Sequence, residues 1–254
     1  MAQGPLIAPG DIIVESWLNF RKNVKTYAEF VVWVALLSVV QWAFSAILKT
    51  AVDDRFMRLT ILALVSLPIL FLVAVLTTSM MDFTAKTLRG KKTDLKEMLS
   101  VGIHKVFPVI WVTVLVGLMY LLGLILLVIP MFVFLVWYRF SQAFVVVDDV
   151  RGGAAMAASK KLSSGRWWAV FARIAVPGLF FYVAAAFATA LAYLLFGAAL
   201  GDPGLFFGNQ PDIGELSNTH TLITSVVPNI INAFALPLFM GADLILWFDL
   251  KRTA

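Results

Sequence analysis

The chain contains no cysteine and only two histidines among its 254 residues. Without cysteine there is no disulfide bond, no thiolate metal ligand and no cysteine nucleophile. His104 and His220 stand far apart, with no further histidine or cysteine beside either, so no metal-ligand set is predicted. The motifs G-x-S-x-G and H-E-x-x-H and a complete P-loop are missing as well. We therefore expect a protein that is not an enzyme and that carries no cofactor and no metal.

Charged residues are also scarce. Only 14% of the chain is charged and 61% is hydrophobic, with a mean hydropathy of +0.91. Soluble domains are roughly 25% charged and 45–50% apolar. This composition predicts an integral membrane protein whose partners are membrane lipids and not nucleic acid. No Gly/Ser-rich or Pro-rich linker divides the sequence, which favours a single membrane domain over residues 1–254.

Long apolar runs are abundant, and each is close to or above the roughly 20 residues that a transmembrane helix needs. The run that begins near residue 106 is too long for one crossing, and Ile129-Pro130 interrupts it where a helix should end or kink. We interpret this interruption as a tight hairpin. The predicted spans are about residues 29–49, 59–81, 106–129, 131–148, 168–200 and 221–249.

A re-entrant fourth segment would instead give five crossings, and the distribution of Lys and Arg distinguishes the two topologies. Six crossings place fifteen of these residues on one side of the membrane and three on the other, whereas five crossings give nine on each side. The biased count favours six crossings with both termini in the cytoplasm. We expect a multi-pass protein of the cytoplasmic (inner) membrane of a prokaryotic cell.

Each odd-numbered span follows a segment that we predict to be a cytoplasmic amphipathic helix in the membrane surface. The first covers residues 11–28, where apolar side chains recur at spacings of three and four residues. The second begins after Thr93, a good N-cap residue, and the third covers residues 154–162. The predicted fold is therefore all-α, with six transmembrane helices arranged as three hairpins and a surface helix before each hairpin.

Basic residues cluster in the second and third of these segments. Lysine and arginine beside a membrane either anchor a loop or bind anionic lipid headgroups. The candidates for headgroup binding are Lys91, Lys92, Lys160, Lys161 and Arg166.

Short segments spread over most of the chain form a recognisable order. They are Ser16-Trp17, Lys22-Asn23, residues 91–99 (KKTDLKEML), Ile129-Pro130, Arg139-Phe140, residues 146–149, Ala158-Ser159 with Leu162, and residues 165–167. In this order they resemble the membrane domain attached to some bacterial glycerophosphoryl diester phosphodiesterases, and related bacterial integral membrane proteins of unassigned function. Met131 stands where that family often has glycine after the hairpin proline. The resemblance implies that hydrolysis belongs to a separate soluble barrel domain, for which we expect no room here.

Several polar residues fall within the predicted spans, where a charge costs about 2.5–3.5 kcal/mol on insertion scales. Arg139 in the fourth span and Asp243 in the sixth have similar predicted depths, so we expect an ion pair between them. The neutral candidates form stripes at helical spacing on the first, fourth and sixth spans. They are Gln41, Gln142, Asn229 and Asn232.

These stripes allow two interpretations. Polar side chains on neighbouring spans hydrogen-bond to hold helices together, or they line a cavity for a small solute or lipid. The first favours a non-enzymatic scaffold or lipid-interacting module, with a possible protein partner or homo-oligomer. The alternative is a small-solute or lipid transporter or channel.

Overall fold

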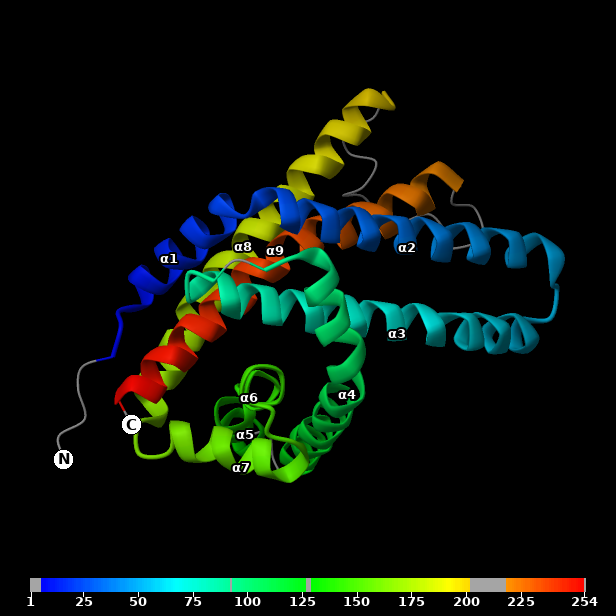
Figure 1. Ribbon diagram of the computed structural model, residues 1–254. Helices are drawn as coiled ribbons and strands as arrows, with labels where there is room; N and C mark the ends of the chain where they lie inside the picture. The colour runs from blue at the N-terminus through cyan, green and yellow to red at the C-terminus, as the bar shows by residue number, and fades with distance from the viewer. Residues whose placement is uncertain (1–5, 92, 127–128, 202–217, 254) are drawn as a thin grey trace. The chain divides into compact units, whose positions relative to one another are not determined.

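The computed structural model describes residues 6–91, 93–126, 129–201 and 218–253, and within these ranges the chain forms nine α-helices and no strand (Figure 1). The helices are α1 (Pro9–Lys22), α2 (Val24–Ala51), α3 (Arg55–Leu88), α4 (Leu95–Ile125), α5 (Ile129–Tyr138), α6 (Ser141–Asp148), α7 (Gly152–Ser163), α8 (Trp167–Ala199) and α9 (Asn218–Thr253).

Six helical segments of the described chain are long and apolar enough to cross a membrane, with α5 and α6 together forming the fourth. The protein is therefore an all-α, multi-pass integral membrane protein, as its composition predicts. The uneven distribution of Lys and Arg in the sequence remains the basis for the prediction that both termini are cytoplasmic.

By spatial contacts the chain divides into two compact units. Unit 1 comprises Met1–Val24, Ala74–Phe180 and Pro237–Ala254, and unit 2 comprises Lys25–Val73 and Phe181–Leu236. Four helices contribute residues to both units: α3, α8 and α9, and α2 through its first residue, Val24. No linker therefore separates the units in sequence. The candidate charged sites all belong to unit 1.

The surface helix predicted over residues 11–28 is shorter than expected, because the chain breaks at Asn23. The side-chain Nδ2 of Asn23 donates to the carbonyl oxygen of Asn19 at 2.8 Å, and α2 starts at the next residue. Asparagine disrupts a helix in this way because its amide competes with the backbone for hydrogen bonds. In α1, Ile12 and Ser16 are buried whereas Trp17 is 50% exposed. Trp17 is therefore left partly uncovered by the described part of the chain.

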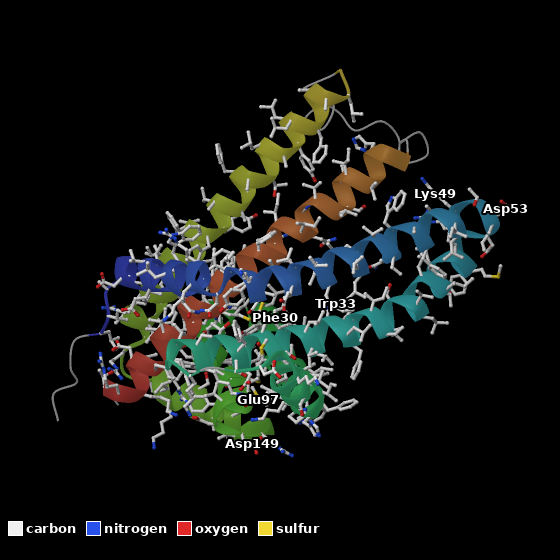
Figure 2. All side chains as sticks on the ribbon, turned by 45° about the horizontal axis from the view of Figure 1, so that its top comes forward. Phe30, Trp33, Lys49, Asp53, Glu97 and Asp149 are labelled. Atoms are coloured by element: carbon white, nitrogen blue, oxygen red, sulfur yellow. The ribbon has the colours of Figure 1, made fainter. Side chains whose placement is uncertain are left out.

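In unit 2, α2 and the first part of α3 form a hairpin whose tip carries Lys49 and Asp53 (Figure 2). Asp54 caps α3, because its Oδ1 accepts a hydrogen bond from the Met57 N–H at 2.6 Å. Both helices run past the predicted span boundaries, since α2 starts five residues before position 29 and α3 ends seven residues after position 81.

The surface helix predicted before the third span is not a separate element. Residues 95–125 form the single helix α4, and neither Gly102 nor Pro108 interrupts it. Gly102 is a site of close helix packing, because a Cβ there would lie 2.7 Å from the carbonyl oxygen of Val75 on α3. This glycine therefore serves contact between α3 and α4 in unit 1.

The predicted hairpin at Ile129-Pro130 joins α4 to α5, and its tightness depends on Gly123. A Cβ at Gly123 would come within 2.6 Å of the Met131 Cα atom. The small residue of this hairpin therefore lies on the first arm, opposite Met131. The two arms run antiparallel, since Gly123 faces Met131 while Lys105, nearer the start of α4, bonds the carbonyl oxygen of Val146 on α6 at 2.8 Å.

Trp247 of α9 is fully buried in the core of unit 1, and its ring meets that of Phe144 edge to face at 5.4 Å between centroids. Leu244, Leu246 and Leu250 on the same helix are fully buried as well. The C-terminal part of α9 is thus a core helix of unit 1, which fixes the charged residues that it carries.

We predict that Gly123→Ala destabilises the protein by about 2 kcal/mol, because the added methyl group meets backbone that cannot move without opening the hairpin. Gly117→Ala is the matched control on the same helix, since nothing lies within 4 Å of a Cβ there. It should leave stability unchanged or raise it by up to about 1 kcal/mol. Unfolding of the purified protein in increasing dodecyl sulfate measures both, and equal stability of the two variants would contradict the packing.

Candidate functional site

Arg139 and Asp243 form the ion pair that their predicted depths suggest. The Arg139 Nη2 lies 2.8 Å from Asp243 Oδ2, and its Nε donates to Oδ1 at 3.1 Å. Two parallel contacts between a guanidinium and a carboxylate fix orientation as well as distance. Asp243 lies in α9, whereas Arg139 lies in the turn between α5 and α6. Both belong to unit 1.

That turn is an interruption of the fourth span that the sequence does not reveal. Its backbone groups are satisfied by Ser159, a fully buried residue of α7. The Ser159 hydroxyl donates to the Trp137 carbonyl oxygen at 2.7 Å and accepts from the Phe140 N–H at 3.1 Å. Broken helices are tolerated in membranes where protein groups satisfy the freed backbone. The predicted surface helix α7 is therefore a structural support for the break.

The neutral candidates are dispersed. Gln142 donates to the Thr113 hydroxyl at 2.9 Å, which links α6 to α4, and Gln41 reaches Ser66 at 3.5 Å in the α2–α3 hairpin. Asn229 bonds the Ser225 carbonyl oxygen on its own helix. These contacts are of the helix-joining or helix-internal kind. Asn232 differs, because it lines a cavity in unit 2.

Two of the predicted headgroup candidates, Lys161 and Arg166, line one pocket together with Lys251 of α9. Its volume is about 400 Å³, within the range of small-ligand sites. No acidic residue lines it, and the other lining residues are Phe144, Ala158, Leu162 and Ser164. We call this the cationic pocket.

The three cations of this pocket differ in how far they are already neutralised. Lys251 pairs with Asp148 at 2.7 Å and lies 4.5 Å from the Trp247 ring centroid. Arg166 donates from Nη1 to the Thr253 hydroxyl at 2.8 Å, but its buried Nε has no hydrogen-bond partner in the described part of the chain. A pocket lined by three basic side chains and no acidic residue favours an anionic ligand.

The remaining headgroup candidates lie elsewhere. Lys160 covers the Trp137 ring at 4.3 Å, so it packs against α5 and does not line the pocket. Lys91 is exposed after the turn that ends α3, and Lys92 lies outside the described residues. The structure therefore groups Lys161 and Arg166 with Lys251, which was not among the predicted headgroup candidates.

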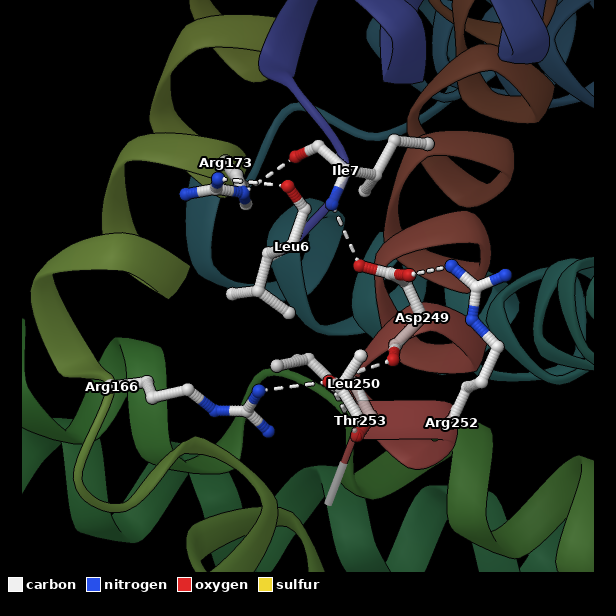
Figure 3. A network of polar contacts seen from close by, with 8 residues as sticks. All are labelled: Leu6, Ile7, Arg166, Arg173, Asp249, Leu250, Arg252 and Thr253. Carbon is white, nitrogen blue, oxygen red and sulfur yellow. Dashed lines mark hydrogen bonds and ion pairs between the residues drawn. The ribbon is translucent and has the colours of Figure 1, made fainter. Parts of the chain in front are cut away.

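A second polar network, also missed from the sequence, holds the N-terminal segment (Figure 3). Asp249 of α9 accepts a hydrogen bond from the Ile7 N–H at 2.8 Å, and Arg252 pairs with the same carboxylate at 2.7 Å. Arg173 of α8 donates to the carbonyl oxygens of Ile7 at 2.6 Å and Leu6 at 3.2 Å. The sequence contained one indication of this network. Asp249 lies near the C-terminus of α9, where a carboxylate opposes the helix dipole and requires partners.

Among the described residues, no group of three or more His, Cys, Asp or Glu side chains is placed to hold a metal ion. No protein-family model, no curated protein and no solved structure matches the chain. The resemblance to the phosphodiesterase membrane domain therefore stays a prediction from sequence.

We predict that Asp243→Asn lowers stability by about 3 kcal/mol, since it leaves the Arg139 charge without its carboxylate within the membrane. Adding Arg139→Leu should restore most of the loss, because the double variant leaves no intramembrane charge unpaired. Thermal unfolding in detergent measures the three proteins. A double variant no more stable than Asp243→Asn would show that the two residues act separately.

Ser159→Ala should cost about 1–3 kcal/mol, because it leaves both the Phe140 N–H and the Trp137 carbonyl oxygen without a partner. Ser164→Ala is the control, since Ser164 follows the end of α7, is exposed, and its hydroxyl bonds only the Lys160 carbonyl oxygen four residues before it. Amide hydrogen exchange at residues 137–141 should accelerate in Ser159→Ala alone. Unchanged exchange there would argue against the support by α7.

Proposed function

We propose that this membrane protein is a non-enzymatic, lipid-interacting module that binds anionic phospholipid headgroups in the cationic pocket. The single observation that carries the proposal is the lining of this pocket, because Lys161, Arg166 and Lys251 contribute to it and no acidic residue does. A phosphate oxygen is the acceptor that a guanidinium N–H fits best in geometry and charge.

The surroundings of the pocket support a lipid in preference to a soluble anion. α8 starts one residue after Arg166 with Trp167 and Trp168, and the Trp168 side chain is 75% exposed. Exposed tryptophan at the end of an apolar helix is typical of the membrane interface. A headgroup phosphate held by Lys161 and Arg166 would then have acyl chains beside α8.

The wider proposal follows the charge asymmetry of the sequence. With both termini in the cytoplasm, the pocket faces the cytoplasmic leaflet of a prokaryotic inner membrane, where anionic lipids attract basic residues at about 1 kcal/mol each. A protein that holds such lipids organises the membrane around it, alone, as a homo-oligomer or beside a partner enzyme. The resemblance to a phosphodiesterase membrane domain agrees with this role.

The alternative is a small-solute or lipid transporter or channel using the polar residues of the first, fourth and sixth spans. The observation that favours it is the cavity beside Asn232 in unit 2. The hydrogen bonds of Gln142 and Asn229 favour a structural role for those two residues.

We expect purified protein to bind phosphatidylglycerol in preference to phosphatidylcholine, as measured by native mass spectrometry of the detergent-solubilised protein. Lys161→Gln should weaken phosphatidylglycerol binding about fivefold, and Arg166→Gln about tenfold or more, because each removes one charge contact with the phosphate. Higher ionic strength should weaken binding further, since screening acts on exposed charges.

Lys22→Gln is the charge-matched control, because Lys22 belongs to the same predicted side of the membrane but does not line the pocket. It should leave binding unchanged. Lys161→Gln should also leave the fold intact, since Lys161 is exposed and makes no hydrogen bond to the described chain. A loss of binding in this variant would therefore not reflect misfolding. Equal binding of the two lipids, or equal effects of Lys22→Gln and Lys161→Gln, would contradict the proposal.

A further inference from the structure

Unit 2 contains a second cavity, of about 410 Å³, whose chemistry is opposite to that of the cationic pocket. No Lys, Arg, Asp, Glu or His lines it. Its residues are Tyr182, Ala185, Ala186, Thr189, Ala190 and Tyr193 of α8 and Asn232 of α9. The three alanines leave room along one side of α8, and two tyrosines, a threonine and an asparagine supply four polar groups.

Two of these polar groups are unsatisfied. The Asn232 amide and the Tyr182 hydroxyl make no hydrogen bond to any described residue, and both side chains are exposed. The other two hydroxyls are engaged, since Thr189 donates to the Ala185 carbonyl oxygen at 2.9 Å and Tyr193 lies 3.5 Å from that of Thr224. The cavity therefore offers free hydrogen-bond donors on two different helices.

The Asn232 amide and the Tyr182 hydroxyl lie deep in the membrane, where an unpaired hydrogen-bond donor raises the free energy of the folded protein. Asn232 lies eleven residues inside the predicted sixth span, about 16 Å from its outer end, and Tyr182 lies about 21 Å from the start of the fifth. Both positions are in the hydrocarbon core, which is about 30 Å thick and holds no water for unpaired polar groups. An occupant that accepts hydrogen bonds at this depth would remove the cost.

The lining of this cavity has no charged residue, which restricts the chemical class of ligand that it can bind. A phosphate or carboxylate would need a cation or several strong donors in the membrane interior, and the lining has no cation. A ring with carbonyl oxygens suits the site better, because Asn232 and Tyr182 donate to carbonyls and the alanines leave space for a flat group. Membrane-soluble quinones combine such a ring with an apolar tail.

From these observations we infer that the cavity between Tyr182 and Asn232 binds the ring of an uncharged, quinone-type lipid. The Asn232 amide and the Tyr182 hydroxyl donate to its carbonyl oxygens, and its tail lies in the surrounding lipid. No redox step is assigned to the protein. This site is independent of the cationic pocket, so either can exist without the other.

Equilibrium binding of radiolabelled decylubiquinone to the full-length protein in phosphatidylcholine nanodiscs tests the inference. We expect saturable binding that Tyr182→Phe and Asn232→Leu each weaken about 3- to 10-fold, the factor for one lost hydrogen bond. Ala186→Phe, which fills the cavity, should abolish binding. Asn229→Leu is the matched control on α9, because Asn229 bonds its own helix and does not line the cavity.

Four results would overturn the inference. Binding that does not saturate, or that Asn229→Leu weakens as much as Asn232→Leu, would show partition into lipid or a general effect on α9. Saturable binding unaffected by Ala186→Phe would place the quinone elsewhere. Loss of self-association in Asn232→Leu, without quinone binding by the wild type, would show that a second copy of the chain satisfies the amide. Circular dichroism of each variant establishes that it is folded.

Discussion

The need to satisfy every backbone polar group inside a membrane shapes unit 1 more than any other constraint. An unbroken fourth span would meet this need without help. The chain instead interrupts it at Arg139 and Phe140, and one serine hydroxyl of α7 serves both a freed N–H and a freed carbonyl. α7 must therefore pack against α5 and α6, which fixes where α8 begins and where Arg166 lies. The cationic pocket is a consequence of how the break is repaired.

Several charged side chains in unit 1 are likewise satisfied by partners within the protein. Arg139 has Asp243, Lys251 has Asp148, and Asp249 has both Arg252 and the backbone of Ile7. The cationic pocket differs from these paired groups, because Lys161 makes no hydrogen bond to the described chain and no acidic residue lines the pocket. This surplus of positive charge is the physical basis for an anionic ligand.

Hydropathy and composition were enough to predict the helical class and six spans, because lipid imposes a length and an apolarity that any sequence must show. The Arg139–Asp243 pair could also be predicted from the sequence, since two charged residues at similar depths inside the membrane have few other partners. The break at Phe140 was not, because its signal lies in Ser159, nineteen residues away and ordinary in a surface helix. The separate surface helix before the third span was wrong because α4 continues from Leu95 to Ile125 without interruption.

The hold on the N-terminal segment is made through main-chain atoms, with Arg173 and Asp249 reaching the carbonyl and amide groups of Leu6 and Ile7 (Figure 3). Recognition of this kind ignores side-chain identity. These contacts fix the number of residues between Leu6 and the start of α1, and they require an N–H at position 7. The contacts therefore tolerate other side chains at positions 6 and 7, but they exclude proline at position 7, which has no N–H.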